Sequence, residues 1–401
     1  MMENKLFYSD PYISTFTAKV LKQEQDELGR WYVVLNQTAF YPTGGGQPFD
    51  TGIIDEKRVI NVEEISGEIR HFLDGPISNC EKIVQGQIDW DRRFDHMQQH
   101  AGQHILSAAF ESLFAYKTVG FHLGEKIVTI DLETEQLTKE EAKKAEQLAN
   151  QIILENRPIQ VKWVTEQELS QYPLRKAPKV KKDIRLVIIP DFDYNGCGGT
   201  HPKTTGEVRG IKILGWERQK KKIRLQFVCG ERVLLQLENK HNVLLSLTKL
   251  LNAPEQELEQ AAVRIIDARK EQEKTIELLQ DQLLQYEAKE LLSNGPPNHM
   301  IGKVFKNRTI QELQKLARFI TVVNEASMAI LVSESENRLQ LVCARGAART
   351  ENMKHVIETV LPHIGGKGGG NDSFAQGGGE ARISGQELLE VVWRTMKIEA
   401  K

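Results

Sequence analysis

The sequence predicts an α+β protein of several domains, and three observations support this fold class. A chain of 401 residues can bury more than one hydrophobic core. Its residue pattern changes from alternating strands to mixed helices and strands, and then to one long helical stretch. A cluster of Gly and Pro residues separates that stretch from a last segment. We therefore expect four parts, at residues 1–90, 91–232, 233–297 and 298–401.

The first part is expected to be a small β-barrel. Residues 14–21 and 31–35 are rich in β-branched and aromatic side chains, which is typical of strands, and Gly, Asp and Asn residues separate them as turns. Further on, Thr43 and Gln47 flank three consecutive glycines. Such a run lets the backbone approach a ligand closely, and the alternative is a β-bulge or a hairpin turn.

The second part is expected to be an α+β layer. Helices are predicted over residues 91–113 and 139–156, and strands over residues 127–132, 159–164 and 184–189. Residues 211–214 and 223–227 are predicted to form a hairpin. The turn of this hairpin holds three consecutive lysines, which are Lys220, Lys221 and Lys222.

The third part is expected to be a long helical arm. Alternating steps of four and three residues give a heptad seam with polar residues at its middle, as in a coiled coil. The seam consists of Leu258, Ala262, Ile265, Arg269, Gln272, Ile276, Leu279, Leu283 and Tyr286. The alternative is a helical hairpin within the chain, because Pro254 breaks the preceding helix and lets residues 237–251 fold back. Residues 293–297 are expected to form a linker.

The fourth part is expected to be a compact α/β domain, with strands near residues 319–323 and 328–333. Two glycine runs follow, at residues 365–370 and 377–379. A phosphate-binding P-loop needs Ser or Thr after its Gly-Lys pair, but Gly368 follows Lys367 here. The sequence therefore argues against ATP binding.

Two motifs in the second part carry metal-ligating residues at a spacing of four. His100 and His104 lie within a predicted helix, where side chains at i and i+4 share one face. Cys197 and His201 flank a Gly-Gly pair that allows a turn. Imidazole and thiolate are ligands that zinc prefers, so we expect one zinc ion per chain. A zinc protease is excluded, because its motif needs a glutamate where Ala101 stands.

Two further residues near these motifs have alternative interpretations. His96 extends the helical spacing to three histidines, but it lies at a polar helix start and is less suited as a ligand. Asp193 could accept a hydrogen bond from a ligating imidazole, and it could equally form a turn.

Charge is distributed unevenly along the chain. The formal net charge is −2, yet residues 174–224 contain 14 basic and five acidic residues, a net charge of +9. This density is expected of a segment that binds a phosphate backbone, although a solvated lysine-rich face is the alternative for the three hairpin lysines. The candidate residues are Arg175, Lys176, Lys179, Lys181, Lys182, Lys220, Lys221 and Lys222.

The chain is expected to be cytoplasmic. It has no signal-like apolar start and no run approaching 18 apolar residues, so we expect no membrane insertion. Its four cysteines, at positions 80, 197, 229 and 343, are scattered and do not suggest a disulfide framework.

Three ordered motifs, at residues 40–52, 100–107 and 197–201, together resemble the editing domain of alanyl-tRNA synthetase. Because the chain shows no counterpart of the synthetase catalytic half, it resembles the free-standing alanyl-tRNA editing proteins of the AlaX class, in their long form. The glycine runs near the C-terminus resemble the DHH-associated domain that closes alanyl-tRNA synthetases.

This resemblance implies a zinc-dependent hydrolase that acts in trans on mischarged tRNA(Ala), most of all Ser-tRNA(Ala) and also Gly-tRNA(Ala). A synthetase pocket built for alanine cannot strongly reject either amino acid, so a second site must remove the error. The metal ligands would be His100, His104, Cys197 and His201, and Thr43 and Gln47 would share the catalytic work. The alternative function is a non-catalytic RNA-binding protein with a structural zinc.

The resemblance also implies a role in RNA binding for the C-terminal domain. We expect its glycine runs to bring backbone N–H groups close to RNA phosphates or bases, and simple tight turns are the alternative. The residues concerned are Gly366, Lys367, Gly368, Gly377 and Gly378. Homodimerisation through the C-terminal region is a further expectation.

Overall fold

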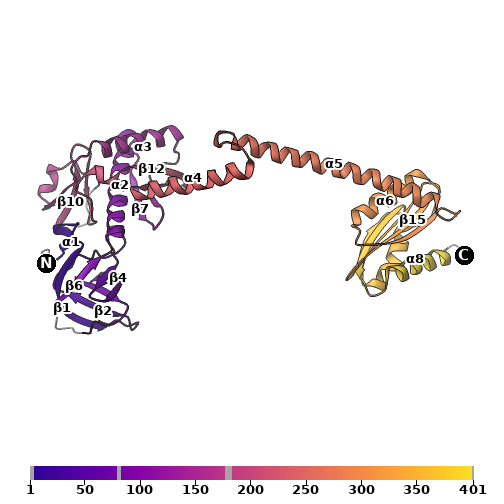
Figure 1. Ribbon diagram of the computed structural model, residues 1–401, viewed down its shortest axis with the longest axis horizontal. Helices are drawn as coiled ribbons and strands as arrows, with labels where there is room; N and C mark the ends of the chain where they lie inside the picture. The colour runs from indigo at the N-terminus through magenta and orange to yellow at the C-terminus, as the bar shows by residue number, and fades with distance from the viewer. Residues whose placement is uncertain (1–3, 79–82, 177–182, 400–401) are drawn as a thin grey trace. The chain divides into compact units, whose positions relative to one another are not determined.

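The computed structural model describes residues 4–78, 83–176 and 183–399. The chain divides into two compact units, Met1–Ser246 and Leu247–Lys401 (Figure 1). Each unit has its own buried clusters, so each is described by itself. Within the described residues, no helix is both long enough and apolar enough to cross a membrane.

Six strands close the predicted N-terminal barrel, in the order β1-β2-β5-β4-β3-β6. They are β1 (Thr15–Gln25), β2 (Trp31–Leu35), β3 (Gly52–Ile54), β4 (Lys57–Ile65), β5 (Glu68–Leu73) and β6 (Ile83–Ile88). Alternate residues of β1, among them Phe16 and Ala18, are buried, as the period of two requires. The short helix α1 (Leu6–Ser9) precedes the barrel, and the prediction of a small β-barrel is confirmed.

The long helix α2 (Trp90–Phe114) connects the barrel to the next layers, and both predicted helices of this part are present. Asp89 caps its first turn by accepting a hydrogen bond from the Arg92 backbone N–H. The Arg93 guanidinium is fully buried and binds both carboxylate oxygens of Asp50, a residue of the barrel. This buried ion pair fixes the helix to the barrel loop that precedes β3.

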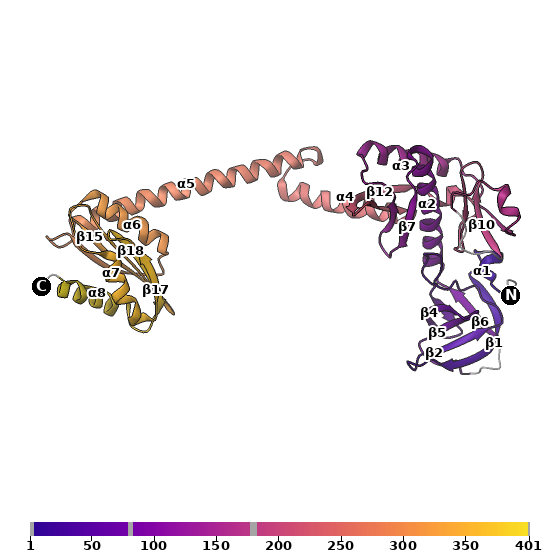
Figure 2. The same cartoon turned by 180° about the vertical axis from the view of Figure 1, so that it is seen from behind.

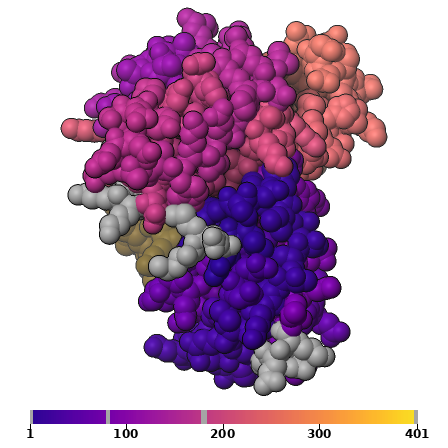
Figure 3. Space-filling view, turned by 90° about the vertical axis from the view of Figure 1, so that its left-hand side faces the viewer, coloured from indigo at the N-terminus to yellow at the C-terminus, as the bar shows by residue number. Residues whose placement is uncertain are grey.

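Two sheets and one further helix complete the first unit, in which the barrel (indigo) and the α+β layers (magenta) lie against one another (Figure 3). The sheets have the orders β12-β13-β8-β7 and β11-β10-β9. Their elements are β7 (Thr118–Leu123), β8 (Val128–Leu132), α3 (Lys139–Leu154), β9 (Gln160–Val164), η1 (Glu168–Gln171), β10 (Ile184–Ile189), β11 (Asp193–Gly196), η2 (Thr205–Val208), β12 (Ile211–Gln219) and β13 (Lys222–Cys229). Gly102 lets α2 approach β13 closely, because a Cβ there would lie 2.1 Å from the Cys229 sulfur.

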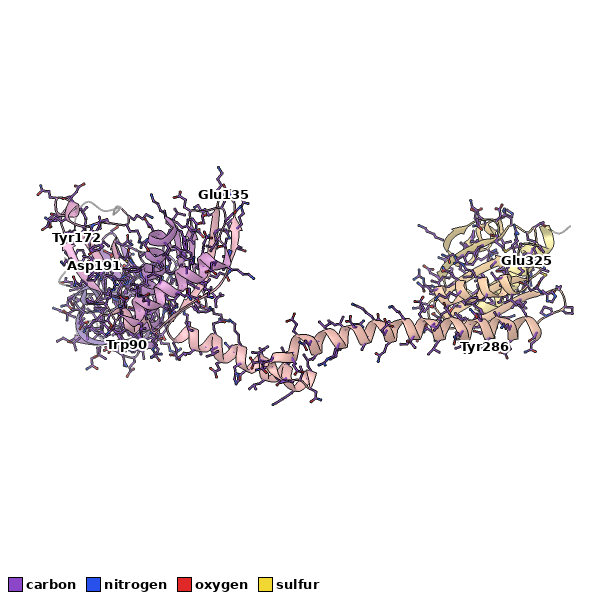
Figure 4. The ribbon with its side chains drawn as sticks, turned by 90° about the horizontal axis from the view of Figure 1, so that it is seen from above. Trp90, Glu135, Tyr172, Asp191, Tyr286 and Glu325 are labelled. Atoms are coloured by element: carbon purple, nitrogen blue, oxygen red, sulfur yellow. The ribbon has the colours of Figure 1, made fainter. Side chains whose placement is uncertain are left out.

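The predicted helical arm consists of α4 (Glu231–Leu251), the turn η3 (Glu255–Glu257) and α5 (Leu258–Ser293). Leu284 and Ala288, near the end of α5, are buried against the C-terminal domain. The seam residues Ile276 and Leu283 are more than half exposed, and Tyr286 projects from the same helix (Figure 4). Coiled-coil pairing along this seam remains a prediction.

The C-terminal domain is a five-stranded sheet with the order β14-β15-β16-β18-β17. Its elements are β14 (Met300–Lys306), α6 (Ile310–Val323), β15 (Met328–Ser335), β16 (Arg338–Arg345), α7 (Met353–Val360), η4 (Leu361–Ile364), β17 (Lys367–Gly370), β18 (Phe374–Glu380) and α8 (Gly385–Glu399). Helices α5 and α6 cover one face, and α7 and α8 cover the other (Figure 2). Neighbouring residues such as Ile330 and Leu331 therefore belong to different buried clusters.

One predicted strand of this domain is wrong. Residues 319–323 form the end of helix α6, not a strand. Thr309 and Glu312 form a capping box at the helix start, and Leu313, Leu316 and Ile320 lie buried on one face. The prediction relied on the β-branched residues at 320–323 alone. The helical spacing of buried residues begins about ten residues earlier and includes this run.

The glycine runs of the C-terminal domain lie mostly in strands, whereas Gly365 forms a left-handed turn at the end of η4, as the tight-turn alternative predicted for that position. They build the hairpin of β17 and β18 at one edge of the sheet. A Cβ at Gly368 or Gly377 would lie within 2.7 Å of a Leu361 methyl group, which explains the glycines by close packing. Because β17 is an edge strand, one side of its backbone is left unpaired by the sheet. A role of the runs in binding RNA remains a prediction.

Candidate metal centre and its cavity

Four predicted metal ligands come together in the first unit. One ligand atom from each of His100, His104, Cys197 and His201 lies within 4.8 Å of the others. The three imidazoles are buried and Cys197 is partly exposed. The Cys197 sulfur lies 3.3 Å from Nε2 of His100 and 3.3 Å from Nε2 of His201.

Helix α2 supplies two of the four groups from one buried face. His100 and His104 are one turn apart, with ring centroids 5.4 Å from each other. His96, one turn earlier, is also buried, but it is not part of the cluster. Burial lowers the pKa of His96 to about 3, and its Nδ1 has no hydrogen-bond partner.

The other two groups come from a turn that follows β11. The Arg185 guanidinium holds this turn by donating to the carbonyl oxygens of Cys197 and Gly199, each at 2.8 Å. The Tyr41 hydroxyl donates to the carbonyl oxygen of Gly198 at 3.1 Å. A Cβ on Gly199 would lie 2.2 Å from the His100 ring, so only glycine lets the turn pass so close to the helix.

Hydrogen bonds behind the two helical imidazoles fix their orientation. Nδ1 of His100 lies 3.1 Å from Oε1 of Gln47, and Nδ1 of His104 lies 2.9 Å from Oδ2 of Asp193. Each bond assigns the proton to Nδ1 and leaves the Nε2 lone pair free to bind an ion. The hydrogen bond predicted for Asp193 is confirmed. Arg175 in turn donates to Asp193 at 2.7 Å, which holds the carboxylate in place.

The cluster favours a thiolate. Burial opposes ionisation of Cys197, but the neighbouring His100 and His201 outweigh it and hold the pKa of the thiol well below its usual range. Burial would also lower the pKa of His104, yet its hydrogen bond to the Asp193 carboxylate raises it to about 9, so an ion that binds at Nε2 displaces a proton from this ring. Burial lowers the pKa of His201 to about 3, so this ring stays neutral.

The donor set fits a zinc ion. Two donors bound to a tetrahedral zinc at about 2.1 and 2.3 Å lie roughly 3.6 Å apart. The 3.3 Å sulfur–nitrogen distances and the 4.8 Å limit lie on either side of this value. His201 is the least supported ligand, because its Nδ1 is buried without a hydrogen-bond partner.

A cavity of about 600 Å³ opens beside the cluster. Its lining comes from the glycine-rich loop, helices α1 and α2, and strands β7, β9, β10 and β11. His100, His104 and Cys197 form part of its wall. A ligand in this cavity would therefore meet the cluster directly.

The glycine-rich loop is a tight hairpin turn, as one alternative predicted. Gly44 and Gln47 exchange backbone hydrogen bonds of 3.1 and 2.9 Å, and Gly45 and Gly46 have positive φ angles of 58° and 84°. Gly45 and Gly46 line the cavity. Thr43 is exposed and is not among the lining residues, so its catalytic role stays a prediction.

Gln47 is almost completely buried, and both ends of its amide are engaged. Its Oε1 accepts from the Thr200 backbone N–H at 3.0 Å, and its Nε2 donates to Thr200 Oγ1 at 2.8 Å. With the contact to His100, these bonds give Gln47 a positioning role instead of a contact with substrate.

The predicted basic residues lie in different environments. Arg175 and Lys176 line the cavity, although the Arg175 guanidinium is committed to Asp193. The lysines of the β12–β13 hairpin turn are exposed. Lys179, Lys181 and Lys182 lie outside the described residues.

Sequence reasoning missed Thr200 and Arg185. Thr200 is fully buried within the second motif, where only its hydrogen bonds to Gln47 reveal a role. Arg185 is the one charged residue in an otherwise apolar strand, β10, and this pattern could have pointed to it.

Two family models match the chain. The model described as the threonyl and alanyl tRNA synthetase second additional domain matches residues 184–226. The model described as class II (A) tRNA synthetases matches residues 2–92. The first match covers β10, the turn with Cys197 and His201, strand β12 and the first part of β13.

Three curated relatives align along nearly the whole chain. The alanyl-tRNA editing protein AlaX-L of Pyrococcus horikoshii is 31% identical over 413 residues, covering 99% of both chains. The alanyl-tRNA editing protein Aarsd1 of Mus musculus is 32% identical over 388 residues, covering 94% of this chain and 92% of that protein. The alanine–tRNA ligase of Pyrococcus abyssi is 31% identical over 415 residues, covering 96% of this chain. The chain spans 43% of the length of that ligase.

Proposed function

This chain belongs to the family of alanyl-tRNA editing proteins, and from that premise we propose that it hydrolyses the aminoacyl ester of mischarged tRNA(Ala). The reaction releases the wrong amino acid and leaves the tRNA for recharging. Serine is the preferred amino acid in this proposal, and glycine is a second substrate.

The observation that carries the proposal is the position of the four-ligand cluster in a cavity wall. Four protein ligands close the shell of a structural zinc, whereas a catalytic zinc keeps one position open, and in this proposal the open position is that of His201, the ligand with the least support. Here three cluster residues line a cavity of about 600 Å³, and Cys197 is partly exposed. This arrangement favours a zinc that meets the substrate.

His100, His104, Cys197 and His201 would hold the zinc ion, one per chain. When bound, zinc supplies a Lewis acid that can polarise an ester carbonyl. Gln47 and Asp193 orient the two helical imidazoles, and the Cys197 thiolate is stabilised by its histidine neighbours. Thr43 remains the candidate for a side-chain contact with the substrate during catalysis.

The preference for serine would come from a polar corner of the cavity. Gln103 and Thr118 line the cavity next to the cluster, and both donate hydrogen bonds to Ser107, at 2.9 and 2.8 Å. A serine hydroxyl could join this network, whereas glycine offers no such group. We therefore expect slower hydrolysis of the glycyl ester.

Binding of the tRNA backbone is assigned to exposed basic residues. Lys176 lies at the cavity, and the hairpin lysines 220–222 extend from the same unit. Affinity for RNA should fall steeply with salt, because each phosphate contact releases counterions. The glycine-rich hairpin of the C-terminal domain is assigned to a second contact with the RNA.

Turnover separates this proposal from a non-catalytic RNA-binding protein with a structural zinc. Protein at one-hundredth of the substrate concentration should deacylate Ser-tRNA(Ala) completely, and Cys197→Ala should abolish the activity. Cys343→Ala is a matched control, because that buried cysteine lies in the other unit. Stoichiometric binding of tRNA without release of serine would refute the enzymatic function.

A further inference from the structure

Tyr41 lies between the glycine-rich loop and the turn that carries Cys197 and His201, here called the turn pair. Its side chain is almost completely buried, at 3% relative exposure. The hydroxyl oxygen lies 3.0 Å from the carbonyl oxygen of Gly44 in the loop and 3.1 Å from that of Gly198 in the turn. Tyr41 therefore connects two segments that are far apart in the sequence.

The hydroxyl has one hydrogen, and the two carbonyl groups do not depend on it equally. The Gly44 carbonyl oxygen already accepts from the Gln47 backbone N–H at 2.9 Å. Among the residues that the structure describes, only Tyr41 donates to the Gly198 carbonyl oxygen. The hydrogen therefore belongs to the bond with Gly198, which is the neighbour of Cys197 in the chain.

Asp50 and Phe7 fix the position of Tyr41. Oδ2 of Asp50 accepts from the Tyr41 backbone N–H at 2.7 Å, and the Asp50 backbone N–H donates to the Tyr41 carbonyl oxygen at 3.0 Å. The Phe7 ring packs nearly perpendicular to the Tyr41 ring, with centroids 5.3 Å apart. Because the backbone and the ring are both held, the hydroxyl has a defined position.

Asp50 is in turn held by helix α2. Nε of Arg93 lies 3.1 and 3.0 Å from the two carboxylate oxygens of Asp50, and neither side chain is exposed. Water does not compete for bonds inside such a dry network. Arg93 lies about two turns before His100 on the helix that supplies both histidines of the helical pair, His100 and His104.

We propose that Asp50 and Tyr41 are positioning residues that set the distance between the two halves of the metal cluster. Helix α2 supplies the helical pair directly. Through Arg93 and Asp50 the same helix fixes Tyr41, whose hydroxyl holds the turn pair in place. Such a link is needed because zinc ligation tolerates only about 0.2 Å. The inference rests on the zinc site of the proposed function, and it does not depend on ester hydrolysis.

The first test is the zinc affinity of the full-length Tyr41→Phe variant, measured by competition with a chromogenic chelator. The substitution removes one oxygen and keeps the ring against Phe7. We expect affinity to fall about 10-fold, at the lower end of the range for loss of a group that orients a ligand, because Gly198 is only a neighbour of a ligand. The visible absorption bands of the cobalt-substituted protein, which report ligand geometry, should also change.

Tyr32→Phe is the matched control. Tyr32 belongs to the same barrel, is also 3% exposed, and donates its hydroxyl hydrogen to Glu24 at 2.9 Å. This variant should lose a similar amount of stability in urea unfolding, because it too loses one hydrogen bond, but it should keep the zinc affinity and the cobalt spectrum of the wild type. Wild-type zinc affinity in Tyr41→Phe as well would overturn the proposal.

A second variant breaks the link one step earlier. Asp50→Asn keeps the shape of the side chain but leaves the buried Arg93 charge without an anion, so stability should fall together with zinc affinity. Where this variant does not fold, Tyr41→Phe decides. Where it folds, the double variant should lose less zinc affinity than the sum of the two single losses, because both residues act through one link. Strictly additive losses would contradict a single link.

Hydrolysis of Ser-tRNA(Ala) separates this proposal from the proposed function. At saturating zinc, Tyr41→Phe should lower kcat more than it raises KM, because the displaced turn pair belongs to the metal cluster and not to the rest of the cavity wall. A wild type whose zinc affinity depends on Tyr41 but that hydrolyses no ester would contradict the proposed function and support the positioning role. Hydrolysis by the wild type, with unchanged zinc affinity and cobalt spectrum in Tyr41→Phe, would do the opposite.

Discussion

Gly199→Ala is expected to displace a metal ligand without unfolding the protein. The new Cβ would lie 2.2 Å from Cε1 and 2.3 Å from Nδ1 of His100, whereas ordinary contact begins at 3.4 Å. The His100 ring would have to move by about 1.2 Å to restore contact. The same Cβ would lie 3.0 Å from Oε1 of Gln47, which contacts Nδ1 of His100 at 3.1 Å, so the substitution also disturbs the contact that orients this ring. Zinc ligation tolerates only about 0.2 Å, so the ion should lose this ligand.

The assay is zinc affinity, measured by competition with a chromogenic chelator, together with circular dichroism to verify the fold. We expect affinity to fall by more than the roughly 100-fold that loss of an outer-shell hydrogen bond can cost. Gly198→Ala is the matched control, because its Cβ would meet only the Tyr8 hydroxyl at 3.6 Å. Equal zinc affinity in the two variants would refute the geometry of the turn.

Three further outcomes are expected. Asp193→Asn should lower zinc affinity by about 10- to 100-fold, because a neutral amide cannot serve both His104 and Arg175 as the carboxylate does; unchanged affinity in the chelator assay would contradict this role. Burial lowers the pKa of His71 to about 4. Between pH 6.5 and pH 4, the His71 imidazole therefore binds a proton in the unfolded state but not in the folded state. The contribution of His71 to stability should therefore be full above pH 6.5 and fall by about 3 kcal/mol towards pH 4 in urea unfolding, and His71→Asn should make the total loss smaller by that amount, while His96 and His201, whose pKa values burial lowers to about 3, still contribute; the same pH dependence in both proteins would exclude a contribution from His71. Truncation after Ser246, the end of the first unit, should leave a folded zinc protein that hydrolyses the ester but binds tRNA more weakly and discriminates less among tRNAs. Equal kinetics with only a changed oligomeric state would assign the C-terminal unit to dimerisation.

The metal ligands could be selected from the sequence because their pattern is local. A spacing of four on a helix and a spacing of four across a Gly-Gly turn each restrict where two side chains can point. The structure brings His100 and His104 into one cluster with Cys197 and His201. The barrel was predictable for a similar reason, since alternation along β1 follows from burial of one face.

The remaining parts of the site depend on contacts between distant segments. Gln47 contacts His100, which lies 53 positions further along the chain. No pattern near Gln47 in the sequence indicates that its amide is buried and hydrogen-bonded. Arg185 gains its importance from the carbonyl oxygens of Cys197 and Gly199, which lie on another segment. Such pairings are set by the fold and are invisible to a local pattern.

The glycine runs near the C-terminus show the opposite problem. Consecutive glycines predict turns or close ligand contacts, but here they form an edge hairpin pressed against Leu361. At Gly368 and Gly377 a neighbouring methyl group of Leu361 leaves no room for a Cβ, and Leu361 lies on a different element, η4. Likewise, Val322 and Val323 favour a strand locally, while the capping box and the buried face of α6 decide for a helix.

The most direct test of the central claim is the rate of Ser-tRNA(Ala) hydrolysis as zinc is added back to the metal-free full-length chain. The rate should rise in proportion to bound zinc and stop rising at one equivalent per chain, because one cluster of four ligands holds one ion. The Cys197→Ala variant should neither bind this one equivalent of zinc nor gain hydrolytic activity when zinc is added. Full hydrolysis without zinc, or a zinc-saturated protein that releases no serine, would contradict the account.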